Sequence, residues 1–108
     1  MNKVVYNACY GGFGLSEKAV EYLRLIHEVF VSQDCELPRH DPRLVDVVES
    51  LGSAVASMDG AYLRVKVIKG DTYRIEDIDG FESVQTPLEL DWVTIQPETY
   101  NEEETQND

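Results

Sequence analysis

The stretch of this chain that decides the fold is Tyr6-Asn7-Ala8-Cys9-Tyr10-Gly11-Gly12-Phe13-Gly14-Leu15-Ser16. It follows the apolar pair Val4-Val5 and places three glycines within four positions, directly before a good helix start at Ser16. Glycine is needed where the backbone takes a positive φ or approaches another group closely. We therefore predict a short strand, a tight glycine-rich loop with exposed backbone N–H groups, and then a helix.

The residues after this loop predict an amphipathic helix that ends between His27 and Ser32. Ser16 is the expected N-cap, and Glu17 places a negative charge in the first turn, where the helix dipole favours it. One face is expected to be buried, because apolar residues recur along it at spacings of three and four: Ala19, Val20, Leu23, Ile26 and Phe30.

A second helix is predicted to begin at Asp41-Pro42, with the aspartate as N-cap and the proline at the first helical position. Gly52 is its expected C-terminal cap. The apolar face of this helix consists of Leu44, Val45, Val48 and Leu51. The stretch 53–60 is weakly patterned and fits either a loop or one further helical turn.

The hydrophobic period then changes to two, which indicates strands. Apolar and basic residues alternate over 62–68, and alternation resumes over 73–77. Asp79-Gly80 is a hairpin signal that leads into Phe81–Thr86. We expect these three segments to form an antiparallel meander. A further edge strand is expected over 88–95, with Leu88, Leu90 and Trp92 on one face.

The order of these elements predicts an α+β fold, a two-layer sandwich with two helices on one face of a mainly antiparallel sheet of four to five strands. The 108 residues allow one modest core. We expect a single domain over 1–95 and an acidic, disordered tail over 96–108. No apolar run reaches the roughly 20 residues of a membrane span. The N-terminus also lacks a signal-peptide pattern, so a cytoplasmic protein without membrane contact is expected.

The net charge of −12 is concentrated in the last third of the chain. Residues 1–70 carry nine acidic and eight basic side chains, whereas residues 71–108 carry twelve acidic side chains and Arg74 as the single base. Direct binding to nucleic acid through that part is disfavoured, because phosphates require Lys and Arg. Two interpretations remain open: a solvated acidic face with a tail, or a surface that imitates the charge of DNA and occupies a basic partner.

Two stretches resemble a family of small uncharacterised proteins found in tailed phages. They are Asn7-Ala8-Cys9-Tyr10-Gly11-Gly12-Phe13-Gly14-Leu15-Ser16 and Arg39-His40-Asp41-Pro42-Arg43-Leu44-Val45, and the later Asp-Gly hairpin accompanies them. The resemblance covers residues 3–85. It implies a viral accessory protein that acts in the host cytoplasm, and it brings no activity to carry over. The segment beyond Pro87 departs from the usual family ending, which leaves any role of the acidic tail to this chain alone.

The glycine-rich loop is one candidate site, for an anion. It matches neither a Walker A loop nor a dinucleotide fingerprint. The anion-binding interpretation rests on backbone N–H groups at the start of a helix and on a nearby guanidinium that would neutralise a phosphate. The alternative is a structural turn in which Phe13 enters the core. The candidate ligand-binding residues are Asn7, Tyr10, Gly11, Gly12, Gly14, Ser16, Arg39, His40 and Arg43.

Arg39-His40-Asp41 is the densest set of catalytic residue types. His40 is a candidate general acid or base oriented by Asp41, with Tyr10 or Cys9 brought near by the fold. Alternatively, Asp41 serves as a helix cap alone. No complete catalytic set emerges, so a non-enzymatic protein is favoured.

No cofactor or metal is expected. The acidic positions 76, 77 and 79 lack EF-hand spacing. The two cysteines, Cys9 and Cys35, lack the spacing of metal ligands and are expected to be reduced, mostly buried thiols.

Aromatic residues among the carboxylates of the last third suit a basic groove on another protein, with the aromatics as anchors and the carboxylates steering the encounter. We expect an inhibitor or modulator that binds a host protein through Asp77, Asp79, Glu82 and Glu89. One alternative is a nucleotide- or phosphate-ligand-binding protein or enzyme that uses the glycine-rich loop. Another is a homo-oligomer in which the exposed final strand pairs between copies.

Overall fold

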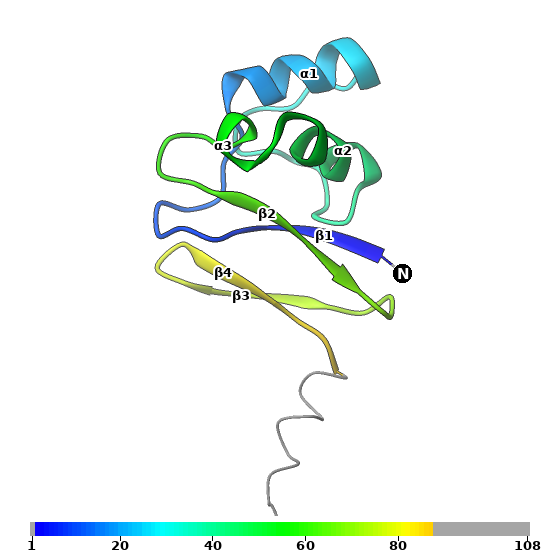
Figure 1. Cartoon of the computed structure of the whole chain (residues 1–108), viewed down its shortest axis with the longest axis vertical. Coiled ribbons are helices and arrows are strands. Elements are labelled where there is room, and N and C mark those ends of the chain that lie inside the picture. Colours follow the sequence, from blue (N-terminus) through cyan, green and yellow to red (C-terminus); the bar gives the residue numbers. More distant parts are fainter. Residues whose placement is uncertain (1, 88–108) are drawn as a thin grey trace, which may run out of the picture.

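Three helices, a pair of strands and a second pair of strands form three successive layers (Figure 1). The computed structural model describes residues 2–87. In chain order the elements are β1 (Asn2–Asn7), α1 (Glu17–His27), α2 (Pro42–Leu51), α3 (Ser53–Ala56), β2 (Leu63–Ile68), β3 (Arg74–Ile78) and β4 (Phe81–Gln85). The α+β class is confirmed. None of the helices in this part of the chain is long and apolar enough to cross a membrane.

The strands form two sheets of two strands, not the predicted single sheet of four to five. β1 pairs antiparallel with β2, with Val5 opposite Val65, and β3 pairs antiparallel with β4, with Ile75 opposite Val84. The predicted meander is therefore wrong at β2, which pairs with β1 and not with β3, whereas the predicted hairpin at Asp79-Gly80 is confirmed as the β3–β4 pair. The chain after β2 turns beneath the first sheet. The strand expected over 88–95 lies outside the described residues.

The first sheet has apolar side chains on both faces, which explains the third layer. Side chains alternate between the two faces of a strand. Val5, Leu63 and Val65 pack with the helices. Val4 and Ile68 on the opposite face pack with Val84 of β4. A two-layer sandwich would leave this second apolar face in water, so the β3–β4 hairpin covers it.

Both long helices begin where the sequence predicts. The Ser16 side chain accepts a hydrogen bond from the backbone N–H of Ala19, and Asp41 caps α2, which starts with Pro42. Gly52 lies at the end of α2, and the weakly patterned stretch after it forms one further helical turn, α3. Both long helices contribute buried side chains to the core: Ala19 and Leu23 from α1, and Leu44, Val45, Val47 and Val48 from α2.

The prediction that the apolar face of the first helix continues to Phe30 is wrong. Ile26 is 59% exposed and Phe30 is 80% exposed. α1 ends at His27, and the left-handed φ of 56° at its C-cap, Glu28, redirects the chain. Beyond that turn Val29 and Val31 pack against the core, and the side chain between them faces water.

Candidate functional site

Three loops meet at one end of the molecule and pack against one another through glycines. They follow β1 (residues 8–14), precede β2 (57–62) and connect β3 to β4 (79–80), and we call this the three-loop end (Figure 1, left). A Cβ on Gly11 would overlap the carbonyl oxygen of Gly60, and a Cβ on Gly80 would lie 2.5 Å from the carbonyl oxygen of Tyr10. The glycines therefore allow close contact between backbones.

Asn7 joins the same three loops through its side chain, which is fully buried. Its Nδ2 donates to the carbonyl oxygen of Cys9 at 2.7 Å and to that of Gly80 at 2.8 Å. Its Oδ1 accepts from the backbone N–H of Tyr62 at 2.8 Å. Because both amide donors and the acceptor are engaged inside the protein, Asn7 positions the loops and does not face a ligand.

Arg39 is paired with Glu82 across the layers. Its Nη1 and Nη2 donate to the two carboxylate oxygens at 2.5 and 2.9 Å. Glu82 is 4% exposed and also accepts from the backbone N–H of Asn7 at 2.9 Å. The guanidinium lies 3.7 Å from the ring centroid of Phe13, a cation–π contact. Glu82 therefore lies beneath the surface on which a partner was expected to bind, and Arg39 is not available to a phosphate.

Arg43 is engaged with Asp41. Its Nε and Nη2 donate to the carboxylate at 3.0 and 2.8 Å, and Asp41 also accepts from the backbone N–H of Arg43 at 2.9 Å. The hydrogen bond from the guanidinium lowers the pKa of Asp41. Asp41 thus acts as a helix cap and as the partner of Arg43.

His40 is separated from Tyr10, one of the residues proposed to work with it. Its Nδ1 lies 2.8 Å from the hydroxyl oxygen of Tyr73. His40 shares a cavity of about 230 Å³ with Asn2 at the start of β1, whereas Tyr10 follows the end of β1 and packs against Phe81. His40, Asp41 and Tyr10 therefore do not come together as a reaction centre.

The two cysteines are free and half-buried. Burial raises the pKa of the Cys35 thiol, which disfavours its nucleophilic thiolate form.

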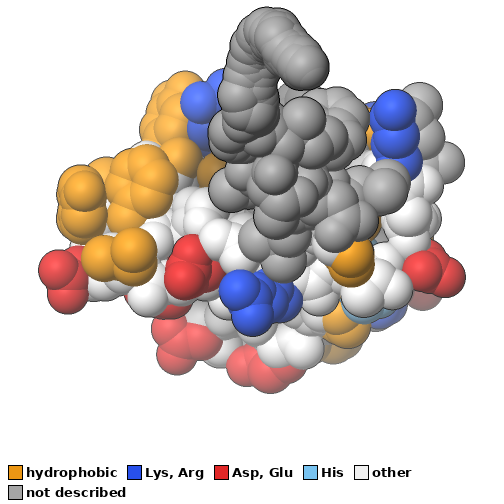
Figure 2. Space-filling model, turned by 90° about the horizontal axis from the view of Figure 1, so that it is seen from below, with side chains coloured by type: hydrophobic (Ala, Val, Ile, Leu, Met, Phe, Trp, Pro, Cys, Tyr) orange, Lys and Arg blue, Asp and Glu red, His pale blue; other side chains and the backbone are white. Residues whose placement is uncertain are grey.

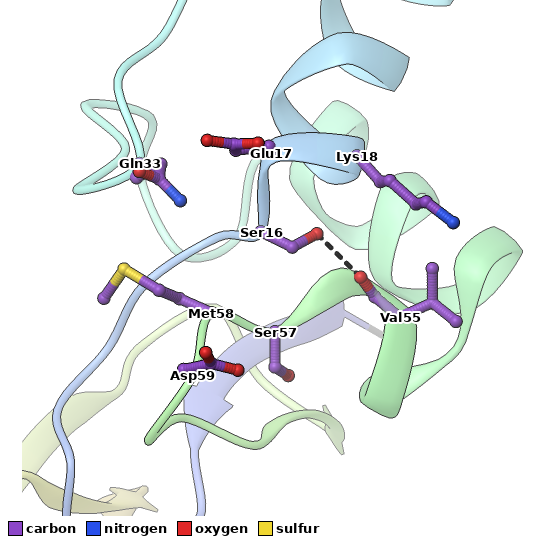
Figure 3. A pocket seen from close by; sticks show the side chains of 8 residues that line it. All are labelled: Ser16, Glu17, Lys18, Gln33, Val55, Ser57, Met58 and Asp59. Atoms are coloured by element: carbon purple, nitrogen blue, oxygen red, sulfur yellow. Dashed lines mark hydrogen bonds between the residues drawn. The ribbon is translucent and has the colours of Figure 1, made fainter.

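A cavity of about 410 Å³ lies beside the start of α1 (Figure 3). The Ser16 hydroxyl donates to the carbonyl oxygen of Val55 at 2.6 Å, and the backbone N–H of Ser16 donates to the carbonyl oxygen of Ala56. Glu17 and Asp59 both line the cavity, and Lys18 extends away from Asp59 (Figure 3). Two carboxylates repel an anion, so this cavity does not favour a phosphate.

Asp46 is the centre of a polar cluster that the sequence analysis missed. His27 Nε2 lies 2.7 Å from its Oδ2, and the Tyr22 hydroxyl donates to the same oxygen at 2.8 Å. The Ser50 hydroxyl donates to Oδ1 at 2.9 Å. The cluster joins α1 to α2, and only the four-residue spacing of Asp46 and Ser50 signals it in the sequence. Ser50 bonds to the aspartate and not to the histidine, so the arrangement is not a nucleophile with its base.

We expect Asp46→Asn to destabilise the protein more at neutral pH than in acid. The hydrogen bond from His27, followed by that from Tyr22, lowers the pKa of Asp46. Such a carboxylate stabilises the fold above its unfolded pKa of about 3.9, and this contribution is lost as the pH falls through the folded pKa. Urea unfolding at about pH 7 and about pH 2.5 should show a larger loss relative to the parent at the higher pH. An equal difference at both values would contradict this account.

An apolar patch lies on the surface of the three-loop end. Tyr10 is 69% exposed, Ile78 64% and Phe81 39%. The ring centroids of Tyr10 and Phe81 lie 5.1 Å apart, and Ile78 is the cross-strand partner of Phe81, so the three side chains are contiguous. Hydrophobic side chains gather at this end of the molecule, beside acidic ones (Figure 2).

This patch results from the orientation of β4. Glu82 and Val84 face inward, whereas Phe81 and Ser83 face outward. A carboxylate is thus buried and its aromatic neighbour exposed, the reverse of what transfer free energies favour. The bonds from Arg39 offset the cost of burying Glu82.

Of the four carboxylates expected to bind a partner, Asp77 and Asp79 are exposed beside this patch. The Asp77 side chain accepts from the backbone N–H of Gly80 at 2.8 Å, which fixes its place at the turn. Glu82 is buried, and Glu89 lies outside the described residues.

Comparisons of the chain with protein-family models, with curated proteins and with solved structures find no match.

Proposed function

We propose that the protein acts by binding another protein through Tyr10, Ile78 and Phe81, with Asp77 and Asp79 at the margin of this apolar patch. The observation that supports the proposal is the exposed, contiguous apolar surface that β4 creates while burying Glu82. Contiguous exposed apolar surface is typical of interaction sites. Tyrosine is among the residues that dominate binding energy at protein interfaces.

The three-loop end supports the patch on a fixed backbone. Glycine contacts join the loops, and the buried Asn7 side chain bonds to all three of them. A surface that is already ordered loses little conformational entropy when a partner binds. This favours rigid recognition over folding upon binding.

The charge of the chain favours a basic partner. The net charge is −12, and Asp77 and Asp79 lie beside the patch. Carboxylates around an apolar centre accelerate the encounter with a basic surface and orient it, and added salt weakens this effect. The resemblance to tailed-phage proteins extends the proposal to a host protein in the host cytoplasm, which this chain inhibits or modulates.

The alternative of a phosphate ligand has less support. Arg39 and Arg43 are each bonded to a carboxylate, and Asn7 and Ser16 are engaged within the protein. No catalytic role is proposed for these residues.

The double substitution Ile78→Ser and Phe81→Ser is expected to weaken partner binding by about tenfold or more, because it removes two apolar anchors. The partner is captured on the full chain from host lysate and purified, and its affinity is then measured by calorimetry. Val67→Ser is the matched control, since Val67 is 50% exposed and lies opposite Lys3, near the other end of β1. Equal affinity of the double variant and the control, with both variants folded by circular dichroism, would overturn the proposal.

A further inference from the structure

The outer edge of β3 has no strand beside it in the part of the chain that the structure describes. A turn of two residues, Asp79-Gly80, joins the closing pair of Ile78 and Phe81. Hydrogen-bonded and non-hydrogen-bonded pairs alternate in an antiparallel ladder. Ile75 and Asp77 therefore direct their backbone N–H and C=O groups away from β4. The carbonyl oxygen of Val84, the cross-strand partner of Ile75, accepts from the Lys66 side chain, which agrees with this alternation.

The hairpin is held firmly, so this edge is a preformed template. Ile75 packs against Val4, Ile68 and Val84 beneath the first sheet. Glu82, the cross-strand partner of Asp77, is fixed by Arg39. A strand added to β3 would meet a backbone that is already extended and would reach the apolar patch through Ile78.

The charges along β3 favour one kind of pairing strand over another. Residues 71–79 contain four carboxylates and one base, Arg74, which is bonded to Gln85. Pairing the β3 edges of two copies would bring carboxylates together, and like charges on adjacent strands are destabilising. A strand with Lys or Arg at alternate positions would instead place cations beside Glu76 or Asp77.

We infer that the partner contributes an extended basic segment that adds to β3 as a third strand, with a basic side chain beside Asp77 and an apolar side chain beside Ile78. This inference rests on the proposed function and specifies the partner. Main-chain hydrogen bonds to Ile75 and Asp77 supply affinity, and the alternating side chains supply specificity.

A short acetylated peptide of alternating lysine and valine is the probe. Amide hydrogen exchange of the full chain is followed by NMR with and without this peptide. The exchange of the Ile75 and Asp77 amides is expected to slow by about tenfold or more, since both gain an acceptor. The same peptide with a methyl group on every backbone nitrogen keeps its charge but loses its ladder donors, and it should leave the exchange of these amides unchanged.

A pair of variants isolates the backbone contribution. Asp77→Pro and Asp77→Ala lack the same carboxylate, but only the proline also removes an edge N–H. Asp77→Pro is expected to lose affinity for the peptide by about tenfold relative to Asp77→Ala. Retention of the core amide spectrum in both variants shows that each is folded.

Three results would overturn strand addition: unchanged exchange at Ile75 and Asp77 with the peptide bound, equal affinity of the two Asp77 variants, or slow exchange at both amides before any peptide is added. The last result would assign the edge to residues 88–108 of this chain. None of them decides the patch proposal, which fails only if the Ile78→Ser and Phe81→Ser double variant keeps its purified partner.

Discussion

Glu82→Ala is expected to lower the free energy of unfolding by about 3–5 kcal/mol, because it leaves the Arg39 guanidinium largely buried without its partner. The Glu82 side chain is 5% exposed and that of Arg39 is 24% exposed. The substitution also removes the acceptor of the Asn7 backbone N–H. Urea unfolding followed by circular dichroism at neutral pH measures the loss.

Lys3 and Glu49 provide the matched control for this prediction. Their side chains are 47% and 45% exposed, and they form an ion pair of 2.9 Å. Glu49→Ala should change the free energy of unfolding by about 1 kcal/mol or less, because water screens this pair. The double substitution Arg39→Met with Glu82→Leu should recover most of the loss seen in Glu82→Ala, since no charge is then left buried. Equal losses for Glu82→Ala and Glu49→Ala would show that the buried pair does not hold the layers together.

The local signals of the sequence predicted local structure well. Ser16 and Asp41 cap the helices as expected because each cap depends on residues two or three positions away. Strand pairing depends on distant residues. The apolar pattern of β2 does not indicate whether β1 or β3 is its partner, and that choice follows from the need to cover both faces of the first sheet.

The candidate site was predicted less well, because its contacts join parts of the chain far apart in sequence. The sequence predicts a tight glycine-rich loop. Glycine is needed there because Gly60 and Gly80 approach the loop closely, which no local pattern reveals. From its charge alone, Glu82 is expected at the surface. Its burial depends on Arg39, which lies 43 positions earlier in the chain.

Asn7→Asp is expected to lower the free energy of unfolding by about 3–5 kcal/mol at neutral pH, because a carboxylate of the same size has no donors for two buried carbonyl oxygens. In the protein the Asn7 Nδ2 donates to the carbonyl oxygens of Cys9 and Gly80, and the side chain is fully buried. The three loops would lose the group that joins them. Thermal and urea unfolding of the variant and the parent measure the effect.

The pH dependence of this loss tests its cause. Burial beside two carbonyl oxygens disfavours the charged form, so the pKa of an aspartate at position 7 should be higher in the folded than in the unfolded state. A proton then restores one donor, and the difference from the parent should shrink as the pH falls from about 7 to about 4.5. Asn2→Asp is the control, because the exposed Asn2 side chain also donates to a backbone carbonyl, that of Gly70 at 2.8 Å. That variant should lose about 1 kcal/mol or less at either pH. If the two variants lose equal stability, or if the loss at position 7 grows in acid, the buried amide is not what fixes the three-loop end.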